Sequence, residues 1–107
     1  MAFKRTYHYT EEEQRLYLYA FAISYPVRQR ILKRLKHNDQ LTVQELFKGH
    51  RIAKSTFSGH LKILRESGLV ICHEEYPHTY YCLDLKMLED AIRYLGDFMK
   101  DDMGIGQ

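Results

Sequence analysis

Cysteine is scarce in this sequence: its 107 residues include only Cys72 and Cys82. Two cysteines are too few for a disulfide scaffold, and no Cys-x-x-Cys spacing indicates a zinc ribbon or a thioredoxin-like redox centre. The fold must therefore come from the burial of apolar side chains, and the length fits a single domain over residues 1–107.

Long hydrophobic runs are absent as well. No apolar run approaches the roughly 20 residues that a membrane span needs, and residues 1–5 lead into polar residues and not into a secretory apolar segment. We therefore expect a cytoplasmic protein with no membrane partner.

The usual signatures of catalysis are also missing. The sequence has no Gly-rich phosphate loop, no nucleophile with a plausible base, and no paired carboxylates in a context that would form a cleft. We predict that the chain is not an enzyme, and we expect neither catalytic residues nor a cofactor.

What the sequence does have is a strongly basic middle. The formal net charge is only +2, but residues 25–65 hold ten lysines and arginines against Asp39 and Glu45, a balance of +8. A basic block inside a folded segment is the electrostatic pattern expected of a surface that binds nucleic acid phosphates. The alternative interpretation is a solvated helix surface with local ion pairs.

Two capping boxes and a proline mark the starts of helices. Thr10 with Glu13, and Thr42 with Glu45, have the spacing at which an N-cap hydroxyl and a carboxylate satisfy each other's backbone N–H groups. Pro26 suits the first turn of a helix, where its missing N–H costs nothing. Apolar residues at helical spacing then predict five helices, over residues 10–25, 26 to near 37–39, 42–49, 54–67 and 85–100.

The order of elements from residue 42 onward is that of a winged helix-turn-helix. Residues 42–67 give a short helix, a tight turn at 49–53 and a longer helix that ends before Gly68, a left-handed C-cap. Two β-prone runs within residues 69–83 then predict a hairpin that turns near Pro77. The predicted fold is mainly α with a small β-hairpin, comprising five helices and a two-stranded wing.

The stretch IAKSTFSGHLKILRESGLV, residues 52–70, resembles the recognition helix and wing entry of the ArsR/SmtB family of winged-helix repressors. Pro26–Leu32 resembles that family's second helix and Tyr80–Leu83 its second wing strand, in the expected order and spacing. The resemblance spans residues 23–98 and implies a homodimer that binds double-stranded DNA and is often released by a ligand or a metal.

The fourth predicted helix carries the candidate DNA-binding residues. Its N-terminal half offers small hydroxyls and donors, which suit a major groove because nothing bulky blocks the approach. Serine and threonine could bond base edges or phosphates, the lysines phosphates, and histidine either, although hydroxyls also cap helices or are simply solvated. The candidates are Lys54, Ser55, Thr56, Ser58, His60 and Lys62, with His78 in the wing.

Three positions depart from the family pattern. Ala53 stands where the family usually has the serine that caps the recognition helix, so Ser55 or water is expected to cap it instead. Gly59 replaces a longer side chain, which lowers helix propensity and permits close backbone approach to DNA. The wing tip at residues 74–78 is acidic where the family commonly has basic residues, which puts wing contacts in doubt, apart from one by His78.

The family's metal sites are not matched. The positions of its thiolate motif hold Thr42 and Gln44, and the last helix has carboxylates but no histidine, a poor ligand set for a transition metal. We predict no metal site. Cys72 and Cys82 could lie side by side on the paired wing strands as a redox switch, although two buried thiols packing as small apolar groups is the simpler interpretation.

The first and last helices, residues 10–25 and 85–100, supply more apolar surface than a monomer of this length needs. Dimerisation is the expected use, with the recognition helices about 34 Å apart on a palindromic operator. The predicted interface residues are Leu16, Tyr19, Ile23, Leu88, Ile92, Leu95 and Phe98. Two alternatives stay open: the aromatics complete the monomer core, or they bind an apolar small-molecule effector.

A second class of function is a winged-helix module that docks onto another protein, because this fold also serves as a protein-binding surface and the wing is acidic. The balance of +8 in the middle of the chain argues against it. We therefore predict a sequence-specific transcriptional regulator, a homodimeric repressor of ArsR type with a non-metal or unknown effector.

Overall fold

The computed structural model describes the backbone of residues 8–103 and the side chains of residues 8–100. In chain order, its elements are α1 (Glu11–Ile23), α2 (Pro26–Lys36), β1 (Leu41–Thr42), α3 (Val43–Phe47), α4 (Lys54–Ser67), β2 (Val70–Glu75), β3 (His78–Leu83) and α5 (Leu85–Met103). The predicted helices and wing hairpin are confirmed, and β1 is an element that the sequence analysis did not predict.

The helix starts follow the predicted local chemistry. The hydroxyl of Thr10 accepts from the backbone N–H of Glu13, whose carboxylate accepts from the N–H of Thr10, and Thr42 and Glu45 repeat this pair at the start of α3. Pro26 occupies the first turn of α2. Each cap satisfies N–H groups that would otherwise lack a partner in the first helical turn.

Two glycines end the helices of the helix-turn-helix. Gly49 follows α3 with φ of 89° and Gly68 follows α4 with φ of 86°, in the left-handed region that a side chain strains. Gly68 also lies against α5, because a Cβ at this position would meet Cε of Met87 at 2.7 Å. This glycine therefore fixes both the exit of the chain from α4 and the packing of α5.

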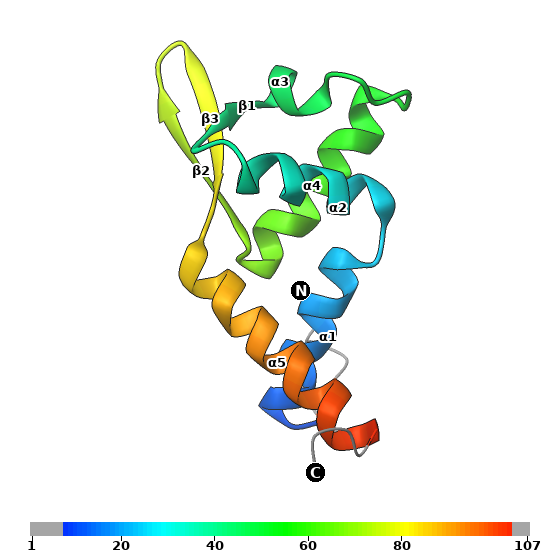
Figure 1. The fold of residues 1–107 in the computed structure, drawn as a ribbon. Coiled ribbons are helices and arrows are strands. Elements are labelled where there is room, and N and C mark those ends of the chain that lie inside the picture. The colour runs from blue at the N-terminus through cyan, green and yellow to red at the C-terminus, as the bar shows by residue number, and fades with distance from the viewer. Residues whose placement is uncertain (1–7, 104–107) are drawn as a thin grey trace.

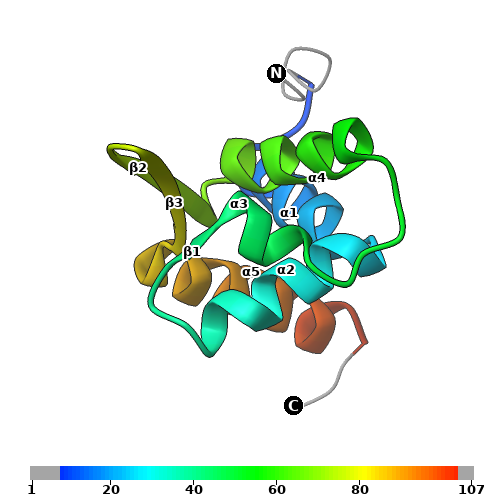
Figure 2. The same cartoon turned by 90° about the horizontal axis from the view of Figure 1, so that it is seen from above.

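Helices α1 and α5 lie side by side and extend away from the helix-turn-helix and wing (Figure 1). Tyr19 of α1 is 1% exposed, packs edge-on against Tyr94 of α5, and donates a hydrogen bond to Oδ2 of Asp90 over 2.7 Å. Seen from above, α2, α3 and α4 form the other part of the molecule, with the wing at its edge (Figure 2).

The sheet has three antiparallel strands in the order β1-β3-β2. β1 pairs Leu41 with Tyr81 and Thr42 with Tyr80. Sequence analysis missed it because two residues are too few to show an alternating pattern, and Thr42 already reads as a helix cap. This third strand attaches the start of α3 to the base of the wing.

The register of the wing corrects the expectation about its cysteines. Cys72 pairs with Tyr81, and Cys82 pairs with Ile71. Because successive residues of a strand point to opposite faces, this offset of one residue places the two thiols on opposite faces of the hairpin. The hypothesis that the two thiols lie side by side is therefore wrong, and the redox switch that depended on it fails. Both cysteines are free and half-buried.

The core lies where α1, α2, α4 and the base of the wing meet. Its side chains come mainly from the predicted apolar stripes of the helices and from the first residues after α4. The buried apolar residues are Tyr19, Ala22, Ile31, Leu32, Leu35, Leu46, Phe57, Leu61, Leu64, Leu69, Val70 and Ala91. This core anchors one face of α4 and leaves the opposite face free.

Candidate nucleic-acid interface

Helix α4 is held by a narrow apolar face. Phe57, Leu61 and Leu64 are buried at the spacing of one helical stripe, and Phe57 packs edge-on against Phe47 of α3. Residues on the opposite side of the helix therefore point outward, and Ser55, Ser58, Gly59 and Lys62 are placed there.

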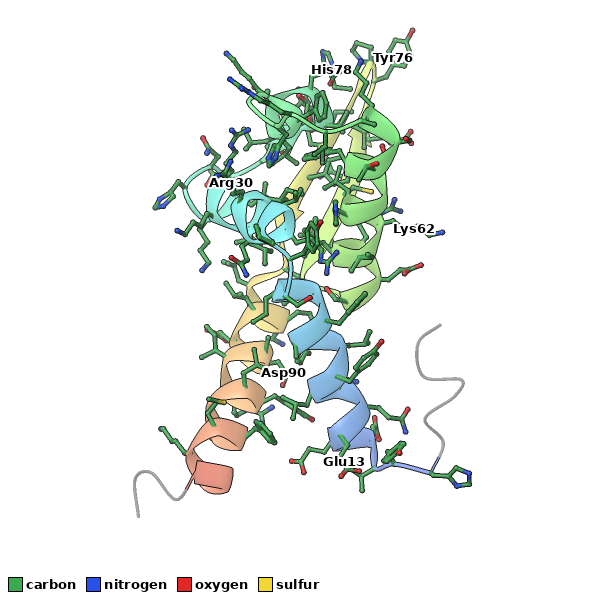
Figure 3. The ribbon with its side chains drawn as sticks, turned by 90° about the vertical axis from the view of Figure 1, so that its right-hand side faces the viewer. Glu13, Arg30, Lys62, Tyr76, His78 and Asp90 are labelled. Carbon is green, nitrogen blue, oxygen red and sulfur yellow. The ribbon has the colours of Figure 1, made fainter. Side chains whose placement is uncertain are left out.

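Most of the predicted DNA-binding residues meet on this outer surface. Lys54, Ser55, Thr56, Ser58 and Lys62 are all exposed on α4. In Figure 3, Lys62 points away from the body of the molecule. We call these five exposed polar and basic side chains the α4 surface.

The N-terminus of α4 has no side-chain cap. Its N-cap is Ala53, and no side chain of the described residues bonds the first N–H groups, so the expected capping by Ser55 is wrong. Uncapped N–H groups at the positive end of a helix dipole suit a phosphate oxygen. Lys54 and Ser55 occupy this end of the helix.

A groove beside the α4 surface leads to the wing. It is lined by residues of α4 and of the first half of β2: Ser58, Lys62, Arg65, Glu66, Val70, Ile71 and Cys72. Two cations, Lys62 and Arg65, therefore face the space between α4 and β2.

His60 lies elsewhere, and its predicted contact with DNA needs correction. Its Nδ1 is 2.8 Å from Nη1 of Arg28, and its ring stacks on Tyr25 with centroids 4.8 Å apart. The ring is half-buried between α4 and the α1–α2 corner and does not project from the α4 surface. Burial, and secondarily the charge of Arg28, lowers the pKa of His60 below that of a free histidine.

The wing tip is highly exposed. Tyr76 is 99% exposed, and Glu74, Glu75 and His78 are exposed beside it. Figure 3 shows Tyr76 and His78 at the end of the hairpin that lies farthest from α5. His78 is exposed and packs edge-on against Tyr80, close to the acidic side chains of Glu74 and Glu75.

The basic block does not form one surface. Arg28 is 3% exposed, and Nη1 of Arg34 donates to the backbone carbonyls of Glu45 and Leu46, both over 2.9 Å. Arg30 of α2 projects on the opposite side from Lys62 (Figure 3). Arg28 and Arg34, which are counted in the predicted balance of +8, therefore stabilise the fold. The cations that belong to the α4 surface are Lys54 and Lys62.

Arg28 and Arg34 are the residues whose roles sequence analysis missed. Arg34 fixes α3 to α2 through the Glu45 and Leu46 carbonyls, and Arg28 connects α2 to α1 and α4. One signal was present: Arg28 precedes Ile31 by three residues and so continues the buried stripe of α2. A cation in line with an apolar stripe indicates a buried group with partners on neighbouring elements.

The residues predicted for a dimer interface separate into two sets. Tyr19 is enclosed between α1 and α5 within one chain, so its assignment to an interface is wrong. Leu16, Ile23, Leu88 and Leu95 are half-buried, while Ile92 is 63% exposed and Phe98 44% exposed. Three large apolar residues of α5, Leu85, Ile92 and Met99, are each more than half exposed, and they follow one another at a spacing of seven positions.

Neither a metal centre nor a membrane helix is found in the part of the chain that the structure describes. No group of three or more histidine, cysteine or acidic side chains among these residues could hold a metal ion. No helix there is both long and apolar enough to cross a bilayer.

The chain is similar to known helix-turn-helix proteins. A family model described as a helix-turn-helix domain matches residues 23–73. The transcriptional repressor SdpR of Bacillus subtilis (strain 168) is 33% identical over 78 residues, which cover 73% of this chain and 86% of the repressor.

Solved structures agree with this match. An ArsR family transcriptional regulator has a TM-score of 0.74 at 21% identity, over 89% of this chain and 95% of that one, and therefore shares the fold. HlyU from Vibrio cholerae has a TM-score of 0.66 at 27% identity, over 84% of this chain and 97% of its own. SdpR and the ArsR family regulator are transcriptional regulators and not enzymes, and the chain belongs to the ArsR family of winged helix-turn-helix, DNA-binding transcriptional regulators.

Proposed function

We propose that this protein is a homodimeric repressor that recognises a specific operator in double-stranded DNA through the α4 surface. One observation carries the proposal. Lys54, Ser55, Thr56, Ser58 and Lys62 are exposed together on one helix whose other face is anchored in the core. A helix presented in this way, with small polar side chains at its N-terminal end, fits a major groove.

The residues of the α4 surface divide by chemistry. Ser55, Thr56 and Ser58 reach base edges or nearby phosphates with their hydroxyls, whereas Lys54 and Lys62 neutralise phosphates. Phosphate contacts set the position of the helix in the groove, and contacts to base edges determine the sequence that it reads. The uncapped N-terminus of α4 adds backbone N–H donors for a phosphate.

The wing contributes less to DNA binding than α4. Glu74 and Glu75 are exposed near its tip and repel phosphates, which leaves His78 as the wing residue that approaches the DNA backbone. The salt dependence of binding therefore comes mainly from α4.

The exposed face of α5 supports the dimer. Leu85, Ile92 and Met99 form one exposed apolar row along α5, with Leu88 and Leu95 half-buried beside it. A monomer gains nothing by exposing such a row, whereas a second copy would cover it. A two-fold dimer would place two copies of α4 about one turn of DNA apart, roughly 34 Å, on a palindromic operator.

A non-metal effector is compatible with this arrangement. Between α1 and α5 lies a cavity of about 270 Å³, lined by apolar side chains such as Leu16 and Phe98 and by charged ones such as Glu12, Arg93 and Asp97. A small organic molecule bound here would act on the helices that the dimer uses, and so would change the spacing of the two α4 helices.

The experiment is a binding titration with duplexes from the DNA upstream of the protein's own coding sequence, beside shuffled duplexes of equal length. We expect tight binding to one upstream duplex, a two-fold symmetric footprint, and loss of discrimination in Thr56→Ala and Ser58→Ala. Equal binding to every duplex would contradict sequence-specific recognition. Binding to no duplex at low salt would favour the protein-docking alternative.

A further inference from the structure

Arg28 is a buried cation whose hydrogen bonds connect three helices. Its Nε donates to the carbonyl of Ala22 over 2.9 Å, and its Nη2 donates to the carbonyl of Phe21 over 2.9 Å and to the hydroxyl of Ser24 over 3.1 Å. Its Nη1 lies 2.8 Å from Nδ1 of His60. The first three bonds reach the end of α1 from α2, and the fourth reaches α4.

The bonds to α1 have a simple physical origin. The last carbonyls of a helix have no partner within the helix, and a cation is favoured at this negative end of the dipole. The last turn of α1 contains no basic residue of its own. Arg28 supplies that cation from α2, and its guanidinium also lies over the rings of Phe21 and Tyr25, at 4.9 and 5.5 Å from their centroids.

The bond to α4 determines the protonation state of His60. An arginine guanidinium is always a donor, so Nδ1 of His60 must be the acceptor and the ring proton must be on Nε2. A second proton would occupy Nδ1 and point at a donor. The hydrogen bond therefore exists only while His60 is neutral.

The groups around His60 disfavour the protonated form of its ring. Arg28 faces it from α2, Tyr25 stacks on it from the α1–α2 corner, and His50 of the turn before α4 is within its electrostatic reach. The carbonyls at the end of α1 are already bonded to Arg28. Burial and the charge of Arg28 both lower the pKa of His60, in agreement with this geometry.

The contact is important because the other contacts that hold α4 are mainly apolar. Phe57, Leu61 and Leu64 hold α4 by packing, which is nondirectional and permits small rotations about the helix axis. A hydrogen bond has a preferred direction. Since His60 follows Thr56 by one helical turn, fixing His60 fixes the direction in which the α4 surface points.

We propose that Arg28 and His60 are positioning residues for operator recognition: the bond from Arg28 to neutral His60 sets the rotation of α4, and a proton on His60 breaks it and weakens specific binding. This inference rests on the proposed function of the α4 surface. It identifies acidification to a pH below the ordinary histidine pKa as a signal that releases the operator.

The test compares the pH dependence of binding to the operator and to shuffled duplex, from about pH 7.5 to about pH 4.5, a range that extends well below the ordinary histidine pKa of about 6.5 because the pKa of His60 is lowered. Circular dichroism at each pH checks that the protein stays folded. For the unsubstituted protein, we expect operator affinity to fall about 10-fold more than affinity for shuffled duplex, the size expected for one hydrogen bond.

Two substitutions at His60 separate positioning from titration. His60→Asn places an amide oxygen near the position of Nδ1 and does not titrate, so it should bind the operator normally at pH 7.5 and keep its affinity within about threefold at about pH 4.5. His60→Ala offers no acceptor and should lose about 10-fold in operator affinity already at pH 7.5. His37→Asn, at an exposed histidine that follows α2, is the matched control and should follow the unsubstituted protein.

The outcomes are distinguishable. Parallel pH curves for the unsubstituted protein and His60→Asn, or full operator affinity in His60→Ala at pH 7.5, would overturn this inference and leave the proposed function intact. Failure of the unsubstituted protein to discriminate the operator at pH 7.5 would overturn the proposed function, and with it this inference.

Discussion

The hydroxyl of Tyr19 donates to Oδ2 of Asp90 over 2.7 Å, and this bond fixes α1 to α5. Asp90 also contacts Arg93 one turn further along α5, so its carboxylate has partners on two helices. The hydrogen bond from Tyr19, more than any other contact, lowers the pKa of Asp90, while burial is the main cause that raises the pKa of Tyr19. Both shifts indicate that the bond stabilises the ionised carboxylate and the neutral phenol.

Removing this bond should destabilise the protein without affecting the α4 surface. Tyr19→Phe leaves Asp90 without its buried partner, and we expect the free energy of unfolding to fall by about 1.5 kcal/mol, as for a hydrogen bond to a charged group. Urea denaturation measures the loss. Tyr17→Phe, at the exposed tyrosine of α1, is the control and should change nothing; equal stability of the two variants would show that the bond contributes nothing.

The same bond contributes to the acid sensitivity of the fold. Because the pKa of Asp90 is lowered in the folded state, its contribution is fully present above the ordinary aspartate pKa of about 3.9. It is lost as pH falls through the lowered value. Acid titrations followed by circular dichroism should therefore show that Asp90→Asn loses less stability than the parent between about pH 5 and pH 2.

His50 is a group whose replacement should stabilise the protein. Its Nε2 is buried with no hydrogen-bond partner among the described residues, and its ring packs against Phe57. His50→Leu removes the unsatisfied nitrogen at similar volume, and we expect a gain of about 1 kcal/mol in the free energy of unfolding at pH 7.

The increase in the free energy of unfolding that His50→Leu gives should be larger at low pH. Burial, followed by the charges of Arg34 and Arg30, lowers the pKa of His50 in the folded state. As pH falls below the ordinary histidine pKa of about 6.5, His50 binds a proton in the unfolded chain but not in the folded protein. The free energy of unfolding therefore falls. Leucine removes that decline. A gain in His50→Leu that is the same at pH 7.5 and pH 5.5 would contradict the shift.

The sequence predicted the features of this fold that depend on neighbouring residues. Capping boxes at Thr10 and Thr42 and the glycine after α4 are local, and the structure has all three. The burial of Arg28 and the register that separates Cys72 from Cys82 depend on residues distant in sequence, and local patterns do not encode them.

The same division applies to the candidate site. The exposure of Lys54, Ser55, Thr56, Ser58 and Lys62 follows from the apolar stripe of α4, which the sequence displays. His60 is on the same helix, but its direction depends on Arg28, which the sequence places 32 residues away. A partner so distant cannot be inferred from helical spacing alone.

A substitution at Gly59 should affect stability and DNA binding in opposite directions. A Cβ at Gly59 would meet no atom within 4 Å, so the protein itself has room for a side chain there. Gly59→Ala should raise the free energy of unfolding by up to about 1 kcal/mol through helix propensity. If the backbone approaches DNA closely, the added methyl group should weaken operator binding by about 10-fold or more.

Gly96 of α5 is the matched control for Gly59, because a Cβ there also meets nothing within 4 Å. Gly96→Ala should give a similar gain in thermal stability, and it controls for helix propensity alone, because Gly96 lies one turn after Ile92 on the face of α5 proposed for the dimer. An undiminished operator affinity in Gly59→Ala would show that DNA does not approach the backbone at this position.

The dimer proposal predicts the effect of a charge on α5. Ile92 is 63% exposed, so Ile92→Glu should leave the fold intact while burying a carboxylate in the interface between two copies. Sedimentation should show a dimer for the parent, a monomer for this variant, and a dimer for Lys86→Glu at an exposed lysine of the same helix. A parent chain that sediments as a monomer at micromolar concentration would contradict the proposed dimer.

The central claim is that the α4 surface neutralises phosphates of a specific duplex, and the salt dependence of operator binding tests it most directly. We expect a steep fall in log K with log salt, and Lys62→Ala should reduce the slope by about 0.9, the value for one phosphate contact, while Lys86→Ala leaves it unchanged. An unchanged slope in both Lys62→Ala and Lys54→Ala would contradict the claim, because the basic residues of α4 would then make no phosphate contact.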